Sequence, residues 1–294
     1  MCSLAAVFDG FAQSRIDTGE AEIHVRHGGS GPPLLLLHGY PQTHAMWHAV
    51  APRLADDFTV VAPDLRGYGR SSKPPTTDDH EPYSKRAMAR DHVAVMRALG
   101  HERFAVCGHD RGGRCAYRLA LDAPERVTRL AVLDIIPTGE VWRRVDMRFA
   151  LSAWHWSFLA APYDLPERMI ATDPDAFYLR GAEDRFDPEA LDDYRRSFRE
   201  PACIHAMCED YRAGATLDHA HDEADRGVRR IGCATLVLWG TRGSIARLDD
   251  VLGLWREWAD DVRGGPVDSG HHLAEEAPDA TCDALADFFT ELPA

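Results

Sequence analysis

Five short apolar runs constrain the fold of this chain more than any other feature. The runs occupy residues 33–39, 58–64, 104–110, 130–136 and 234–240. Continuous apolar runs of this length are typical of strands that are buried on both faces, as in a parallel sheet. Apolar residues recur at helical spacing between the runs, for example at Met88, Val95 and Leu99. The alternation predicts an α/β fold with a mostly parallel, doubly wound sheet.

The rhythm of strands and helices breaks between residues 138 and 230. This stretch is rich in Trp, Tyr, Arg and Asp, and it contains helical patterns but no convincing strand. We therefore expect a helical cap at 138–230, inserted between a first core part at 1–137 and a second core part at 231–294. A helical decoration without a role in the active site is the alternative.

The charge balance and the cysteines narrow the class of protein. The formal net charge is −14 over 294 residues, which argues against binding to nucleic acid or to an anionic membrane. Any anionic substrate then needs local positive charge. The seven cysteines are odd in number and form no close pairs, so we expect reduced thiols and a cytoplasmic protein. The first 15 residues predict no signal peptide, and no apolar run is long enough to span a membrane.

The segment GHDRGGR at 108–114 places Asp110 between two glycines at the spacing of a nucleophile elbow. The motif alone is weak, but here it follows an apolar strand and precedes a helical pattern, which is the context that such an elbow requires. Most elbows carry serine at this position. An ordinary helix N-cap is the alternative role for Asp110.

Two further segments supply partners for a nucleophile at Asp110. In HGYP at 38–41, the backbone N–H of Tyr40 is a candidate oxyanion donor, together with that of Arg111. In SGHH at 269–272, His271 is the expected base and His272 ranks below it. The paired histidines lack a third ligand at a convincing spacing, so we expect no metal.

The orienting acid is predicted to be Asp134. In folds with such an elbow, this acid usually lies a few residues after the strand that corresponds to 234–240, but no carboxylate follows there until Asp249. Asp134 ends the run LAVLD and takes the role instead. A capping aspartate at a strand end is the alternative.

Several of these motifs together resemble the fluoroacetate dehalogenases, a haloacetate dehalogenase branch of the α/β-hydrolase superfamily, over nearly the whole chain. The resemblance lies in the segments 34–48, 108–114, 130–138, 154–160, 208–215 and 269–279. It implies an α/β-hydrolase fold with a helical cap, hydrolysis of a haloacetate without a cofactor, and a homodimer.

The resemblance also implies roles for individual residues. Asp110 is the nucleophile, His271 the base and Asp134 its partner. Arg111 and Arg114 hold the substrate carboxylate. Surface salt bridging is the alternative role for these two arginines. His155, Trp156 and Tyr211 donate hydrogen bonds to the departing halide. Packing in the core of the cap is the alternative role for these three residues. The segment 176–185 is short and contains no tryptophan, unlike that of the family.

Two other functions compete with dehalogenation. An epoxide hydrolase uses the same type of nucleophile, and it would use cap tyrosines to protonate the epoxide oxygen. The candidates are Tyr163, Tyr178, Tyr194 and Tyr211. Arg111 argues against this reading, because those enzymes usually carry tryptophan at its position. A non-catalytic binding protein of the same fold is less favoured, because it need not keep Asp110, Asp134 and His271 together.

Overall fold

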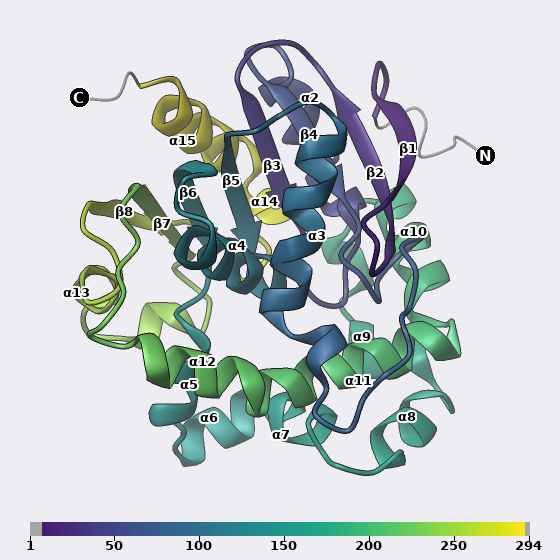
Figure 1. Cartoon of the computed structure of the whole chain (residues 1–294). Coiled ribbons are helices and arrows are strands. Elements are labelled where there is room, and N and C mark those ends of the chain that lie inside the picture. The colour runs from purple at the N-terminus through teal and green to yellow at the C-terminus, as the bar shows by residue number, and fades with distance from the viewer. Residues whose placement is uncertain (1–7, 292–294) are drawn as a thin grey trace.

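The computed structural model describes residues 8–291. One eight-stranded sheet runs through the molecule in the order β1-β2-β4-β3-β5-β6-β7-β8 (Figure 1). The strands are β1 (Ala12–Asp17), β2 (Glu22–Gly28), β3 (Pro33–Leu37), β4 (Thr59–Pro63), β5 (Phe104–His109), β6 (Val127–Leu133), β7 (Ala234–Gly240) and β8 (Val262–Val267). From β4 to β8 the neighbours pair in parallel, and β1 and β2 join antiparallel. The predicted, mostly parallel sheet is confirmed.

Helices cover both faces of the sheet. On one face lie α3 (Lys85–Ala98) and α4 (Asp110–Asp122), and on the other α2 (Ala51–Leu54) and α15 (Pro278–Thr290) (Figure 1). Leu34, Leu35, Leu36 and Leu37 of β3 are all fully buried as a result. Side chains on both faces of the central strands lose contact with water, and this explains why the runs are apolar without alternation.

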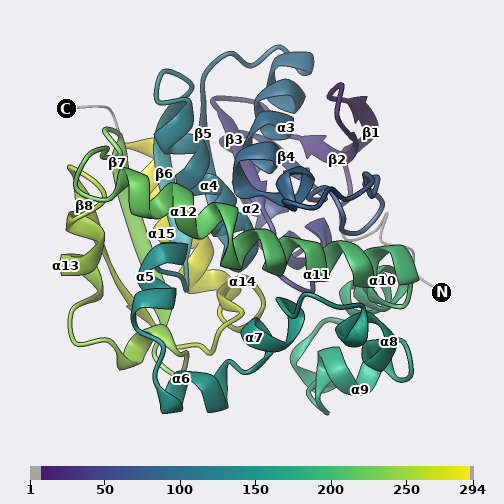
Figure 2. The same ribbon diagram turned by 60° about the horizontal axis from the view of Figure 1, so that its bottom comes forward.

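The chain between β6 and β7 contains helices joined by loops, and one isolated β-bridge at Ile231. Its α-helices are α5 (Thr138–Arg143), α6 (Met147–Ser152), α7 (His155–Leu159), α8 (Leu165–Ile170), α9 (Pro174–Leu179), α10 (Pro188–Phe198), α11 (Pro201–Ala215) and α12 (Leu217–Asp225), and η3 (Glu183–Arg185) is a 3-10 helix. We term residues 138–230 the cap segment. Figure 2 shows α11 and α12 in succession across the molecule, between the sheet and the shorter helices α6 to α9. The division into three parts at 137/138 and 230/231 stays a prediction.

The parallel strands bring distant parts of the sequence to one edge of the sheet. Asp110 follows β5 directly, Asp134 follows β6, and Tyr40 lies three residues after β3. His271 lies between β8 and the short helix α14 (Leu273–Glu276). Because the carboxyl ends of parallel strands meet at the same edge, these four residues gather there.

Two observations bear on the expected environment. In the part of the chain that the structure describes, no helix is both long and apolar enough to cross a membrane. Six cysteines carry free thiols, and Cys2 lies outside the described residues.

Candidate active site

The turn at Asp110 has the strained geometry of a nucleophile elbow. Asp110 has φ = 46°, in the left-handed region that non-glycine residues rarely adopt. Steric contact requires glycine at the flanking positions 108 and 112. A Cβ on Gly108 would lie 2.4 Å from the carbonyl oxygen of Gly112, and one on Gly112 would lie 2.3 Å from that of His38. The turn therefore holds the Asp110 side chain at the end of β5, beneath the cap segment.

The carboxylate of Asp110 is buried and ionised. Its Oδ2 accepts a hydrogen bond of 3.0 Å from the backbone N–H of Tyr40. Burial alone would raise the pKa of Asp110, but the imidazoles of His271 and His109 and the nearby guanidiniums lower it below its usual range. The Arg111 amide lies in the first turn of α4. Among the described residues, no hydrogen bond joins it to this carboxylate.

His271 and Asp134 form a closely bonded pair. Nδ1 of His271 lies 2.6 Å from Oδ2 of Asp134, and Oδ1 of Asp134 accepts a 3.0 Å hydrogen bond from Gly240 N–H. Burial lowers the pKa of His271, but the hydrogen bond and charge of Asp134, with the charge of Asp110, raise it overall. With Nδ1–H directed at Asp134, Nε2 is left to accept a proton. This contact with Asp134 distinguishes His271 from His272. Asp249, the first carboxylate after β7, is exposed.

Arg111 is fully buried and held by the cap segment. Nε lies 3.0 Å from Oδ2 of Asp210 in α11, and Nη2 lies 2.5 Å from Oδ1 and 2.7 Å from its carbonyl oxygen. Lys85 and Tyr68 bind the same Asp210 carboxylate. The remaining nitrogen of Arg111, Nη1, is buried and has no hydrogen-bond partner among residues 8–291. Surface salt bridging, the alternative role for this arginine, does not describe it.

Arg114 is also buried, and among the described residues no carboxylate forms an ion pair with it. Nη1 donates to the carbonyl oxygen of Ile136 at 2.8 Å and lies 3.3 Å from Oγ1 of Thr138. Nε is buried without a hydrogen-bond partner. The next arginine on the helix differs, because Arg118 is ion-paired to Asp222 and Asp225. Arg114 is therefore a buried cation whose partner is missing from the described chain.

The three residues expected to bind halide form one aromatic group, and two of them lie over these arginines. The ring of Trp156 lies over the guanidinium of Arg114 at 4.6 Å, and that of Tyr211 over Arg111 at 4.4 Å. The rings of Trp156 and Tyr211 pack edge to face at 5.7 Å. The cap segment thus places aromatic rings on both charged groups, an arrangement that favours cations.

His155 completes this group. Its ring is parallel to that of Tyr40, with centroids 6.0 Å apart, and its Nδ1 is buried without a hydrogen-bond partner in the described part of the chain. Burial lowers the pKa of His155 to about 3, and the positive charge of Arg180 adds to this effect. The imidazole is therefore neutral and carries one N–H.

The structure brings together all the residues that the sequence predicted for the site. They are Tyr40, Asp110, Arg111, Arg114, Asp134, His155, Trp156, Tyr211 and His271. The sequence analysis missed Asp210, Lys85 and His109. The acidic pair before Tyr211 in CEDYRAGA was a signal for Asp210, whereas nothing in the local pattern singled out Lys85.

The cap tyrosines differ in their positions. Tyr163 is 71% exposed, and the hydroxyl of Tyr194 donates to Glu275 at 2.8 Å. Tyr178 and Tyr211 both pack edge to face on Tyr40, with centroids 5.7 and 5.1 Å away. The segment that lacks a tryptophan therefore supplies a tyrosine ring next to the site.

One cluster in the described chain has the composition of a metal site. His24, His44 and Asp64 are fully buried, with potential ligand atoms within 4.8 Å of one another. Both oxygens of Asp64 already accept backbone N–H groups, from His44 and Arg70, each at 2.9 Å. His44 Nδ1 adds a contact of 2.7 Å. These contacts describe a hydrogen-bonded network that ties the loop after β3 to the loop after β4.

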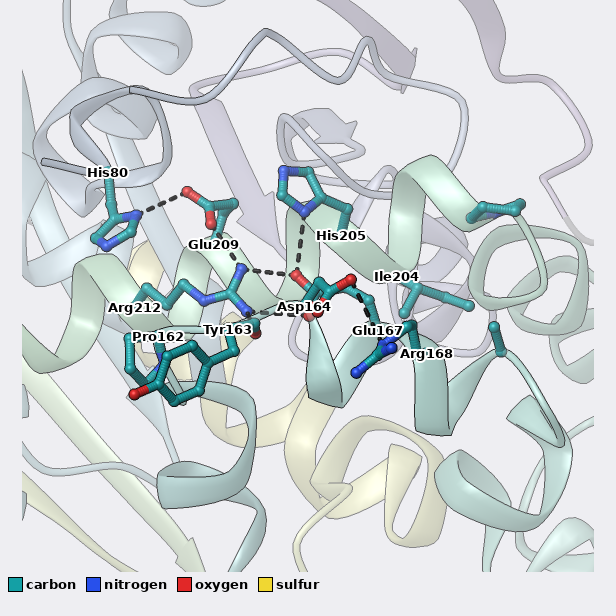
Figure 3. A pocket seen from close by; sticks show the side chains of 12 residues that line it. His80, Pro162, Tyr163, Asp164, Glu167, Arg168, Ile204, His205, Glu209 and Arg212 are labelled. Carbon is teal, nitrogen blue, oxygen red and sulfur yellow. Dashed lines mark hydrogen bonds and ion pairs between the residues drawn. The ribbon is translucent and has the colours of Figure 1, made fainter. Parts of the chain in front are cut away.

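A surface pocket of about 430 Å³ lies on the cap segment, and none of the predicted site residues lines it. Figure 3 shows Arg212 between Glu167 and Glu209, with His80 and His205 beside them. Arg212 contacts Glu167 at 2.6 Å and Glu209 at 2.7 Å, and each histidine bonds to one of the glutamates. Ion pairs within the chain occupy these charged groups.

Comparison with known proteins places this geometry in a family. A sequence model described as the alpha/beta hydrolase fold matches residues 32–278. The chain belongs to the α/β-hydrolase fold family. Within this family the chain is 46% identical to a fluoroacetate dehalogenase of Burkholderia sp, over 97% of its own length and 96% of the relative's. The α/β-hydrolase is therefore haloacetate dehalogenase-like, and it is a hydrolase.

Other α/β-hydrolases are also similar. A soluble epoxide hydrolase of Corynebacterium sp. (strain C12) is 34% identical, over 92% of this chain and 94% of the relative. The crystal structure of ALR0039 from Nostoc sp PCC 7120 superposes with a TM-score of 0.95 and 52% identity, over 97% of this chain and 100% of that one. These matches agree on the α/β-hydrolase family, but the relatives are named for different substrates.

Proposed function

We propose that this hydrolase converts a haloacetate, such as fluoroacetate or chloroacetate, to glycolate and halide. The observation that carries the proposal is Arg114, a buried guanidinium beside Asp110 that has no carboxylate partner in the described chain. Burying a cation without an ion-pair partner is costly, and the charge of the nearby Asp110 offsets only part of that cost. A substrate carboxylate would supply the missing partner, and the free Nη1 of Arg111 offers a second donor to it.

In the first step, the Asp110 carboxylate attacks the carbon that bears the halogen. The carbon–halogen bond breaks, its electron pair leaves with the halide, and an ester forms on Asp110. The lowered pKa of Asp110 keeps this group ionised, so the step needs no base. A serine would leave an ether here, which water does not readily cleave, whereas a carboxylate leaves an ester.

In the second step, Nε2 of His271 takes a proton from water, and the hydroxide attacks the carbonyl carbon of the ester. The oxyanion forms on the Asp110 oxygen that faces the Tyr40 N–H, which donates at 3.0 Å before the reaction begins. Collapse of the intermediate releases glycolate and restores Asp110. The proton on His271 passes to the leaving oxygen or to solvent, and Asp134 stabilises the imidazolium in between.

The halide requires donors in a site that excludes water, because fluoride is a poor leaving group. We assign this role to the N–H groups of His155 and Trp156 and to the hydroxyl of Tyr211. The burial of Trp156 and Tyr211 and their position over the two arginines support the assignment, and the ring of His155 packs edge to face on that of Tyr211 at 5.9 Å. The small anionic haloacid is the only partner that the proposal needs. A homodimer and a cytoplasmic location remain predictions from the sequence.

Epoxide hydrolysis is the second candidate, because the same nucleophile serves it and one relative is named for it. Tyr211 and Tyr178, which both contact the Tyr40 ring, are the tyrosines placed to protonate an epoxide oxygen. A neutral epoxide would leave Arg114 unpaired, and this favours the haloacid.

The deciding experiment offers purified protein fluoroacetate, chloroacetate and styrene oxide, and measures free halide and diol. We expect halide and glycolate from the acids. Diol from the epoxide without halide from either acid would overturn the proposal. A His271→Asn variant should stop after the first step, so its mass should increase by one carboxymethyl group on Asp110.

A further inference from the structure

One carboxylate outside the proposed site binds the backbone on both sides of His271. Glu276 is the last residue of α14. Its Oε2 accepts a 2.7 Å hydrogen bond from the N–H of Gly270, and its Oε1 accepts a 3.1 Å hydrogen bond from the N–H of His272. The two amides that flank His271 are therefore joined through a single side chain.

The carbonyl group of His271 is held as well. His109 Nε2 lies 2.8 Å from this oxygen, and the rings of His109 and His271 pack 4.6 Å apart. Burial and the neighbouring His271 lower the pKa of His109 to about 4, so His109 is neutral and donates through Nε2. His109 directly precedes Asp110, and this hydrogen bond links the nucleophile's strand to the loop that carries the base.

The glycine before His271 gives this carboxylate room. A Cβ on Gly270 would lie 2.6 Å from Oε2 of Glu276, so a larger residue there would require the Glu276 carboxylate to move. Among the described residues, Arg242 forms an ion pair with this carboxylate, with its Nη2 3.9 Å from Oε2. The Glu276 side chain is 18% exposed, so it is mostly buried against the loop.

We propose that Glu276 is a positioning residue for the ester-hydrolysis step, through its two hydrogen bonds to the backbone around His271. The inference rests on the proposed function for the identity of the step. Asp134 orients the imidazole about its own axis, whereas Glu276 fixes the backbone from which the imidazole projects. Because His271 acts only in the second step, loss of Glu276 slows hydrolysis of the ester and leaves its formation almost unchanged.

The test is Glu276→Gln, in which the amide nitrogen replaces one acceptor and faces a backbone N–H. Rapid quenching with bromoacetate, followed by intact-protein mass spectrometry, separates ester formation from decay. We expect formation within about two-fold of wild type and decay about ten-fold slower or more, since small misplacements of a reacting group are costly. Equal slowing of both steps, or unchanged decay, would overturn the proposal.

Two further variants keep the test decisive. Glu276→Asp keeps the charge but shortens the side chain, so we expect it to slow ester decay selectively as well. It replaces Glu276→Gln as the test if Glu276→Gln gives little soluble protein. Asp279→Asn is the matched control. This neighbouring carboxylate is 94% exposed and pairs with Arg53, so we expect wild-type rates for both steps.

A second measurement is independent of the substrate. The short His271–Asp134 contact should give a low-field Nδ1–H proton resonance, assigned by its loss in Asp134→Asn. We expect this signal to broaden or move upfield in Glu276→Gln. If no haloacid reacts with wild type, the proposed function fails, and this signal still tests whether Glu276 positions His271. An unchanged signal would contradict the positioning role.

Discussion

The guanidinium of Arg111 is held by Asp210 at two points, 3.0 Å from Nε to Oδ2 and 2.5 Å from Nη2 to Oδ1. The third nitrogen, Nη1, is left buried without a partner. Asp210 also binds Lys85, so a second cation shares its negative charge. The pair thus fixes the orientation of Arg111 and leaves part of its positive charge available to an anion.

The substitution Arg111→Leu should discriminate charged from uncharged substrates. Loss of a buried charge pair costs on the order of 2–5 kcal/mol, which is roughly a thirty- to several-thousand-fold fall in kcat/KM. We expect this fall for chloroacetate and a much smaller one for chloroacetamide. The backbone N–H of residue 111 is retained, and Lys85 still neutralises Asp210. Equal losses on both substrates would assign Arg111 a structural role.

The substitution Trp156→Phe should affect fluoride release more than bromide release. It removes the indole N–H but keeps an aromatic face over Arg114. A hydrogen bond to a charged group is worth about 1.5–3 kcal/mol, and fluoride depends on such help more than bromide does. We expect kcat for fluoroacetate to fall further than kcat for bromoacetate, measured by halide release. Parallel losses would make Trp156 a packing residue.

The pH dependence of hydrolysis should follow His271. Only neutral His271 accepts a proton from water, and the raised pKa of His271 places this condition above the usual range for histidine. In the ester intermediate the charge of Asp110 is gone, but the hydrogen bond and charge of Asp134 still raise the pKa of His271. The rate of ester decay should therefore rise with pH through the pKa that Asp134 raises. In Asp134→Asn the carboxylate that raises the pKa of His271 is lost. The increase in the rate of ester decay should therefore move to lower pH, and the plateau rate should fall. A rise at the same pH in both proteins would contradict this account.

The Glu275 side chain should make stability depend on pH. Burial raises the pKa of Glu275 to about 8, although the hydrogen bonds from Tyr194 and Gln42 oppose this effect. Between pH 4.5 and 8 the unfolded chain loses this proton and the folded protein keeps it, so the contribution of Glu275 to stability falls as pH rises. The glutamine side chain of the Glu275→Gln variant does not titrate in this pH range. The Tm of the variant relative to wild type should increase from pH 5 to pH 8, and a constant difference would refute the assignment.

Local sequence patterns predicted much of the fold and of the site. The apolar runs identified the buried strands, because burial on both faces demands apolar side chains whatever the neighbours are. The glycines around Asp110 identified the elbow, because the close approach of Gly112 to His38 admits no side chain. The absence of a carboxylate after β7 pointed to Asp134.

The contacts between distant segments could not be predicted in this way. Asp210 is 99 residues from Arg111, and it reaches that arginine only because α11 packs above the sheet. The pairing of His271 rather than His272 with Asp134 likewise depends on how the loop before α14 is held.

The sequence by itself thus determined which residues were available for nucleophile, base, acid and anion binding, and which strands carry them. The tertiary structure alone decided which charges find partners. Arg111 and Lys85 meet at Asp210, while Arg114, among the described residues, donates hydrogen bonds only to uncharged oxygen atoms. The physical reason is that burial and turn geometry are encoded over a few residues. The electrostatic balance of a site depends on distances between groups that only the packed cap and sheet bring together.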